Sequence, residues 1–219
     1  MKENLISWLL DFLITLPVIL ISLSVHEWMH GYMAYRLGDP TAKSMGRLSF
    51  NPLRHIDPIG FLALMFFHVG WAKPVSVNSR YFKNPKRDLA LTALAGPASN
   101  FVLAFVCAFL SVFLFKIGLS LDLLTKTPFL VFCTMVDSMV IINLGLCVFN
   151  LIPIPPLDGS KILYSVLPYQ VIYKIIPYEK YIQFVMIFLL WLGVLSKPIQ
   201  LAVQFFYTLF MNLAQGVLF

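Results

Sequence analysis

Charged side chains are scarce in this sequence: Asp, Glu, Lys and Arg make up 12% of the 219 residues, about half the share typical of soluble domains. Hydrophobic residues make up 59%, and the mean hydropathy is +0.83. No charged tract or polar linker sets off a soluble part. The composition therefore excludes a soluble globule and indicates a protein whose solvent is the lipid bilayer.

Cysteines are also few. Cys107, Cys133 and Cys147 lie in apolar stretches and lack the close spacing of a thiolate metal site or of a disulfide scaffold. The net charge is +6, but the basic residues lie in short loops and not on one amphipathic face. This distribution argues against a nucleic-acid partner and is typical of cytoplasmic loops of membrane proteins.

Several apolar stretches have about 20 residues, the length of a helix that crosses a hydrocarbon core of about 30 Å. We predict an all-α polytopic membrane protein with about five to six transmembrane helices, and with residues 1–219 as one domain. The first helix lacks the basic leader and cleavage site of a signal peptide, so we expect it to stay in the membrane. A three-helix core is expected over residues 5–163 and a closing helical hairpin over 181–219. The expected helices cover residues 4–37, 89–115, 129–152, 181–195 and 199–219.

Residues 59–69 form an apolar stretch that is too short to cross a bilayer as an upright helix. Basic residues flank it, with Arg47 and Arg54 before it and Lys73 and Lys83 after it. Because loops rich in Lys and Arg stay on the cytoplasmic side, both flanks are predicted to be cytoplasmic. The stretch is then re-entrant or interfacial, and a short, tilted spanning helix is the alternative.

Ionisable residues interrupt the first apolar stretch at His26-Glu27-Trp28-Met29-His30, which fits the pattern H-E-x-x-H. Histidines four residues apart lie one above the other on a helix face, so both imidazoles can reach one Zn²⁺ ion. Glu27 is then positioned as a general base. Ionisable groups in a spanning helix are costly unless paired, hydrated or metal-bound, which favours a zinc site over two histidines that hydrogen-bond between helices.

A catalytic zinc ion takes three protein ligands and keeps a fourth position open. The candidates for the third ligand are His55, His68 and Asp158. Asp158 is favoured because it follows a proline-rich stretch, residues 153–156, in which regular helix cannot form. Irregular backbone at membrane depth is tolerated around a polar cavity, where a carboxylate can face a metal on a neighbouring helix.

A second motif contains this carboxylate and reads Asn150-Leu151-Ile152-Pro153-Ile154-Pro155-Pro156-Leu157-Asp158-Gly159. Together with His26-Glu27-x-x-His30, it closely resembles the paired motifs of the site-2 protease family of intramembrane zinc metalloproteases. Between the two, Ala95-Gly96-Pro97-Ala98-Ser99-Asn100 is similar to the Gly-Pro-x-x-Asn element of the family's middle core helix. Residues 51–58 resemble the compact bacterial members, and no segment of the chain could form the PDZ or CBS domain of larger members. The resemblance covers about residues 17–163.

The resemblance implies one zinc ion per chain, with His26, His30 and Asp158 as ligands and Glu27 as catalytic base. It also implies that Asn150 holds the substrate backbone near the metal.

Asn100 is the second substrate-binding candidate, because its amide could hydrogen-bond the substrate or the oxyanion. A buried hydrogen bond between two helices is the alternative for Asn100.

The family further implies a β-like element over residues 59–77 that pairs with an unwound substrate. The alternation Val75-Ser76-Val77 is compatible with a strand. We expect His55 to be an interfacial loop histidine, and His68 to be structural.

The implied function is intramembrane endopeptidase activity on transmembrane or signal-peptide-like substrates, in regulated intramembrane proteolysis or in clearance of membrane peptides. An upstream protease or a regulatory membrane partner would help to select substrates. The expected location is the bacterial inner membrane, with the active site toward the cytoplasm.

Two other functions remain open. In the first, a transporter or channel uses the same ionisable residues as an ion path. In the second, an inactive relative serves as a chaperone or scaffold, although the intact Glu27 argues against it.

Overall fold

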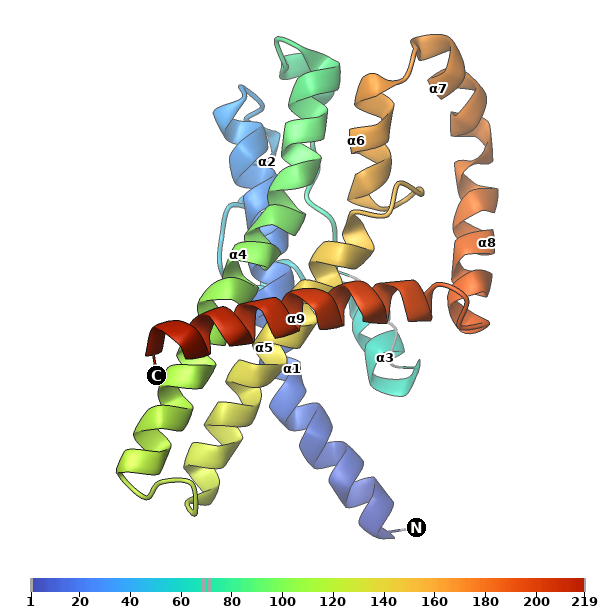
Figure 1. Cartoon of the computed structure of the whole chain (residues 1–219). Helices are drawn as coiled ribbons and strands as arrows, with labels where there is room; N and C mark the ends of the chain where they lie inside the picture. Colours follow the sequence, from blue (N-terminus) through green and yellow to red (C-terminus); the bar gives the residue numbers. More distant parts are fainter. Residues whose placement is uncertain (1, 68–69, 71, 219) are drawn as a thin grey trace.

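The computed structural model describes residues 2–67, 70 and 72–218, and helices dominate it (Figure 1). Within these residues the β-type pairing is a single antiparallel bridge between Ile56 and Ala72. The predicted all-α architecture is therefore confirmed. In the described part of the chain four helices, fewer than the five to six predicted, are long and apolar enough to cross a membrane: α1 (Lys2–Arg36), α4 (Pro85–Ser120), α5 (Thr127–Asn150) and α9 (Ser196–Leu218).

Shorter elements connect the four long helices. Their bounds are α2 (Thr41–Ser44), η1 (Pro52–Arg54), α3 (Pro58–Phe67), η2 (Ser79–Tyr81), α6 (Asp158–Val166), α7 (Tyr169–Ile175), η3 (Ile176–Tyr178) and α8 (Glu179–Trp191).

Helix α1 ends where the sequence predicts, at a glycine. Gly38 has φ 108°, and its N–H donates to Tyr35 O (3.1 Å) while the Asp39 N–H donates to Ala34 O (2.9 Å). These two bonds form a Schellman motif, which satisfies the last carbonyl groups of the helix and requires a residue that tolerates the left-handed conformation. The stop places His26 and His30 within the last three turns of α1.

Helix α4 is the centre of the molecule, because it packs against α1, α5, α6 and α9. Small residues on α4 allow α5 to approach closely, and a phenylalanine of α9 completes the buried cluster. This cluster consists of Ala104, Cys107, Ala108, Val136, Val140, Leu144 and Phe210.

The predicted closing hairpin of residues 181–219 does not form. After α8 the chain turns at Gly193, which has φ 75°, and α9 then lies across α4 and α5 while α8 stands apart (Figure 1). The rings of Phe206 and Phe210 meet Phe101 of α4 edge to face, with centroid distances of 5.2 and 5.0 Å. Aromatic contacts of this kind stabilise packing of α9 on α4 instead of on α8.

Helix α3 corrects the predicted β-like element, since residues 58–67 are helical. Its ten residues rise about 15 Å, half of a hydrocarbon core, and the short, tilted spanning helix stays an untested alternative. Residues 73–78 have neither helix nor strand, and the strand expected at Val75-Ser76-Val77 is absent from this described segment. The physical reason is that several backbone groups of this segment bond to side chains instead of to a neighbouring strand; the Val75 N–H, for example, donates to Glu27 Oε2 (2.8 Å). The re-entrant position remains a prediction.

Candidate metal centre

Three ligand-type atoms from two distant parts of the chain converge at the cytoplasmic-predicted end of α1. His26 Nε2 and His30 Nε2 lie 2.9 Å apart, and Asp158 Oδ2 lies 3.2 Å and 3.0 Å from them, respectively. All three residues are buried. Donor atoms around a tetrahedral zinc ion, with bonds of about 2.0–2.1 Å, are separated by about 3.3 Å. The group therefore has the dimensions to hold one metal ion.

The hydrogen bonds behind the imidazoles explain why a cation fits here. His26 Nδ1 donates to Asn100 Oδ1 (2.5 Å), and His30 Nδ1 donates to the carbonyl oxygen of Thr92 (2.7 Å). A neutral imidazole that donates from Nδ1 presents a lone pair at Nε2. The unprotonated Nε2 atoms of both imidazoles thus face the Asp158 carboxylate. In metal sites, hydrogen bonds at the other ring nitrogen orient histidine ligands in this way.

Asp158 is presented at the first residue of α6, directly after the proline-rich turn. Gly159 makes this possible, because a Cβ at that position would lie 2.4 Å from Leu151 O and 2.5 Å from Ile152 O. Only a glycine lets the start of α6 pack so closely on the end of α5. Burial raises the pKa of Asp158, while the positive charge of Lys161, whose Nζ lies 3.2 Å from Oδ1, lowers that pKa and favours the ionised form. Asp158 is therefore a carboxylate.

Lys161 is a site residue that the sequence reasoning missed. Its Nζ lies 3.2 Å from Asp158 Oδ1, while Oδ2 faces the imidazoles. The ammonium group thus binds Oδ1 and leaves Oδ2 free to coordinate a metal. The signal was available, since Lys161 follows Asp158 by three residues at the start of a helix and therefore lies on the same face.

Glu27 shares a cavity of about 380 Å³ with the three ligand-type residues. Its Oε2 accepts a hydrogen bond from the Val75 N–H, which fixes the carboxylate against the 73–78 segment. That segment is held at both ends. Arg47 donates to the carbonyl oxygens of Lys73 (2.6 Å) and Pro74 (3.2 Å), and Asp39 Oδ2 accepts from the Asn78 N–H (2.7 Å). The sequence reasoning used Arg47 only as a topology signal and missed this role.

Asn100 is completely buried, and its amide is used within the protein. Besides accepting from His26, it donates from Nδ2 to Asn143 Oδ1 (2.6 Å) and to Ser22 O (3.3 Å). The three partners come from α1 and α5, so Asn100 has the interhelical role that the sequence left as the alternative. The predicted substrate contact has no support in this structure, in which both donors and the acceptor of the amide bond to protein atoms.

Asn150 has a different environment. It is half-buried at the end of α5 and lines the cavity that contains Glu27 and the ligand-type residues. Its Nδ2 donates to Leu146 O one turn earlier (2.9 Å), and its second N–H and its amide oxygen have no hydrogen-bond partner among the described residues. In the described structure the Asn150 side chain therefore bonds within α5 and makes no hydrogen bond to a neighbouring helix.

His55 lies outside the metal group. It is 2% exposed and directly follows η1 in a loop, and its expected position at the membrane interface stays a prediction. Its Nε2 donates to Ser49 O (2.7 Å), and its backbone oxygen accepts from the Lys73 N–H (2.8 Å). His68, for which a structural role was predicted, falls outside the residues that the structure describes.

Gly96 on α4 gives a test of this packing. A Cβ at Gly96 would lie 2.4 Å from His30 Nε2 and 2.8 Å from His26 Cε1, so Gly96→Ala is expected to displace both imidazoles. We expect metal affinity to fall at least about tenfold, as measured by zinc retained against a graded chelator series. Gly216→Ala is the matched control, because a Cβ there meets nothing within 4 Å. Equal zinc retention in Gly96→Ala and the parent would contradict the packing described here.

Comparison with known proteins bears on the identity of this centre. The model of Peptidase family M50, the site-2 protease family, matches residues 14–193. The chain belongs to this family. The resemblance that the two motifs suggested is therefore confirmed, and the M50 chain is a metalloprotease of a membrane-embedded family.

Individual relatives agree with this assignment. YwhC of Bacillus subtilis (strain 168), named as a candidate zinc metalloprotease, is 39% identical over 181 residues, which cover 80% of each chain. Two further proteins named in the same way are similar. Rip2 of Mycobacterium tuberculosis (strain H37Rv) is 31% identical over 66% of this chain and 53% of its own length. MJ0611 of Methanocaldococcus jannaschii is 32% identical over 71% of each chain. No solved structure matches the chain significantly.

Proposed function

We propose that this M50 metalloprotease is an intramembrane zinc endopeptidase that cleaves transmembrane segments of other proteins. The observation that carries the proposal is the convergence of His26, His30 and Asp158, with Glu27 beside them, in one cavity among helices long enough to span a membrane. The chemistry of the donor set, two imidazoles and one carboxylate, suits zinc with one open position.

A zinc ion held by these three residues would supply Lewis acidity to a peptide carbonyl and to an attacking water. Glu27 is then the general base that takes the proton of this water. The hydrogen bond from Val75 to Oε2 holds the carboxylate in place and leaves Oε1 to accept that proton. Lys161 keeps Asp158 in the ligand orientation by binding Oδ1.

Substrate backbone can be held on two sides of the cavity. Residues 73–77 border it through Pro74, Val75 and Val77, and Asn150 borders it from the end of α5. A transmembrane segment hides its peptide bonds in helical hydrogen bonds, so pairing with exposed backbone and with an amide would stabilise an unwound, cleavable form.

The ion-path alternative agrees less well with the geometry. In an ion path, ionisable groups follow one another along a route, whereas His26, His30 and Asp158 share a single point. Asn100 and the Thr92 carbonyl accept hydrogen bonds from the Nδ1 atoms of the two imidazoles and fix the orientation of the rings, as outer hydrogen-bond partners of metal ligands do. Membership of a metalloprotease family points the same way.

The proposed location is a bacterial inner membrane, with the active site toward the cytoplasm, because the basic loops lie near the catalytic end of α1. Substrates would be transmembrane or signal-peptide-like segments, in regulated intramembrane proteolysis or in clearance of membrane peptides. An upstream protease or a regulatory membrane partner would complete the selection.

Purified protein incubated with a panel of single-span membrane proteins, with and without a chelator, tests the proposal. We expect cleavage within the apolar segment of at least one substrate, its loss with chelator, and its return with zinc. Cleavage that persists at full rate in metal-free protein would reject the proposed mechanism.

Asn150→Ala tests the role proposed for that residue. We expect zinc content and melting temperature to stay as in the parent, while cleavage of an intact helical substrate falls about ten- to a hundredfold. The loss should be smaller for a substrate already unwound by a helix-breaking residue near the cut. Asn212→Ala on α9, where the residue is exposed, is the matched control. A lower melting temperature with an equal loss on both substrates would show that Asn150 supports the fold instead.

A further inference from the structure

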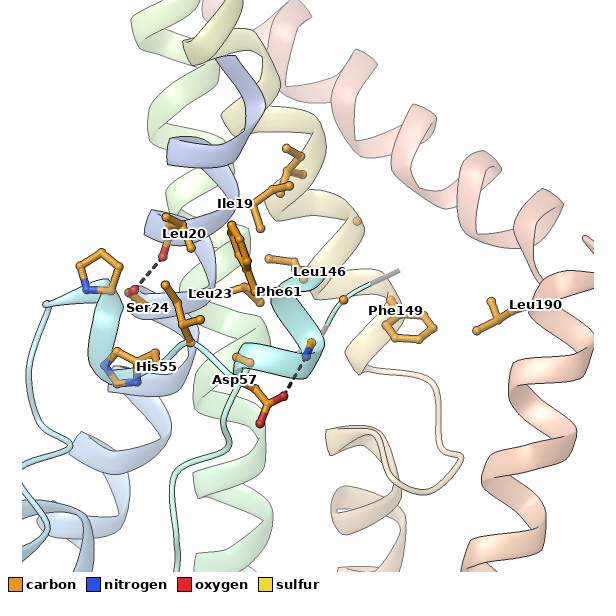
Figure 2. Close-up of a pocket in the computed structure, with 17 residues that line it drawn as sticks. Ile19, Leu20, Leu23, Ser24, His55, Asp57, Phe61, Leu146, Phe149 and Leu190 are labelled. Carbon is orange, nitrogen blue, oxygen red and sulfur yellow. Dashed lines mark hydrogen bonds between the residues drawn. The ribbon is translucent and has the colours of Figure 1, made fainter. Parts of the chain in front are cut away.

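A second cavity, of about 560 Å³, lies beside the metal centre (Figure 2). Three elements enclose most of it: the middle of α1, the 52–61 region with the start of α3, and the last two turns of α5. Figure 2 shows apolar side chains from all three around the space. The most prominent are Ile19, Leu20, Leu23, Phe61, Leu146 and Phe149.

The polar side chains in these walls are Ser24, His55 and Asp57. Ser24 Oγ donates to Leu20 O (2.6 Å), and Asp57 Oδ1 accepts from the Gly60 N–H (2.8 Å), as the dashed lines in Figure 2 show. His55 donates from Nε2 to a backbone carbonyl, while its buried Nδ1 has no hydrogen-bond partner among the described residues. The rest of the lining is hydrocarbon and aromatic surface, so the cavity suits a mainly apolar side chain.

The two cavities adjoin along the same three elements. On α1, Leu23 and Ser24 line the apolar cavity while His26 and Glu27 line the metal cavity; on α5, Phe149 and Asn150 are divided in the same way. The third border is the irregular segment after α3, where residue 72 lines the apolar cavity and residues 74, 75 and 77 line the metal cavity. A peptide lying along this segment would pass from one cavity into the other.

The spacing of the cavities matches an extended peptide. Leu23 and Glu27 are one helical turn apart, which is about 6 Å along α1. Two residues of an extended chain span about 6.6 Å, and their side chains point to the same side. If the scissile bond of an extended peptide lies at the metal position, the side chain about two residues away reaches the apolar cavity. This residue lies on the side of the scissile bond that faces the middle of the apolar stretch of α1.

We propose that this cavity is a specificity subsite, which selects substrates with a large apolar or aromatic side chain at that position. The inference rests on the proposed function, and it names a feature of the substrate that the metal centre itself does not determine. A volume of about 560 Å³ accommodates a Phe or Leu side chain with ease, and a small residue would leave the apolar walls uncovered. The subsite therefore favours substrates with a large side chain about two residues from the scissile bond.

Helix α5 offers a direct way to fill the subsite. Gly145 borders this cavity and also a neighbouring cavity beside α9, and a Cβ built there meets nothing within 4 Å, so a larger side chain is accommodated without displacing protein atoms. Leu146 lines the same space, and Leu146→Phe narrows it from an adjacent position. Gly216 on α9 also has open space around its Cβ but lies outside the cavity, so Gly216→Leu is the matched control for Gly145→Leu.

The experiment uses two substrates that differ only in Phe or Ala at the subsite position, after the cut has been mapped by mass spectrometry. We expect the parent and Gly216→Leu to prefer the Phe substrate about tenfold or more in kcat/KM. Gly145→Leu and Leu146→Phe should bring this ratio close to one. Zinc content and melting temperature are measured for every variant, so that a folding defect is recognised.

A photoreactive phenylalanine analogue at the same substrate position gives a readout that needs no turnover. In protein carrying Glu27→Gln, it should crosslink to the α5 peptide that contains Leu146 and Phe149, and Gly145→Leu should suppress that crosslink. An unchanged Phe-to-Ala ratio in both cavity variants, or a crosslink that forms only with lipid, would overturn the subsite. Absence of cleavage of both substrates by the zinc-loaded parent would instead reject the proposed function.

Discussion

Glu27→Gln is expected to lower the rate of peptide cleavage by about 10²- to 10⁴-fold, the usual contribution of a general base, while the zinc content stays at that of the parent. The amide keeps the size of the carboxylate and can still accept a hydrogen bond from the Val75 N–H through its oxygen. What is lost is the ability to take a proton from the attacking water. Single-turnover cleavage of a zinc-loaded sample, with metal analysis of the same sample, measures both quantities.

Glu179→Gln is the control for this change, because Glu179 starts α8 and pairs with Tyr164 away from the metal cavity. It should cleave at the rate of the parent. Residual activity in Glu27→Gln within a few fold of the parent would assign the base role to another residue. A loss of zinc would show that Glu27 supports the metal site and not only the proton transfer.

Asp158→Ala is expected to remove nearly all zinc from the purified protein and, with it, all measurable cleavage. The substitution leaves the imidazoles of His26 and His30, and two ligands seldom hold zinc in competition with a chelator. It also leaves the ammonium group of Lys161 without the carboxylate that neutralises it. Zinc per chain after dialysis against chelator, determined by elemental analysis, gives the answer.

Asp11→Ala provides the comparison, since Asp11 is exposed near the start of α1 and lies far along the helix from the metal residues. It should retain zinc and activity. If Asp158→Ala kept as much zinc as this control, the third ligand would have to be sought elsewhere.

The arrangement around Gly96 and Asn100 shows how the middle helix contributes to the site without supplying a ligand. Gly96 allows α4 to lie directly against the imidazoles, and Asn100, one turn later, orients His26. The same Asn100 joins α4 to α5 through Asn143. Helix packing and ligand orientation thus depend on the same side chain, so changes in this region should affect metal affinity and stability together.

Helix positions could be predicted because the apolar stretches are long and their ends carry strong signals. Gly38 ends α1 as expected, and the spans of α4 and α5 overlap their predicted ranges almost fully. The course of residues 59–78 could not be predicted. A short apolar stretch can be a helix or a strand, and its backbone found side-chain partners that are distant in sequence, such as Glu27 and Arg47.

The sequence by itself determined the class of the protein and its family, and it predicted which residues carry the chemistry, because H-E-x-x-H and the Asn-to-Gly motif at residues 150–159 are local patterns with a defined chemical meaning. Only the tertiary structure decided that His26, His30 and Asp158 share one point, that Asn100 faces inward while Asn150 lines the cavity, and that Lys161 binds the second oxygen of Asp158. It also decided that α9 crosses α4 and α5 instead of pairing with α8. These features depend on contacts between residues more than 40 positions apart or on the direction of single side chains, and neither is encoded in a local pattern.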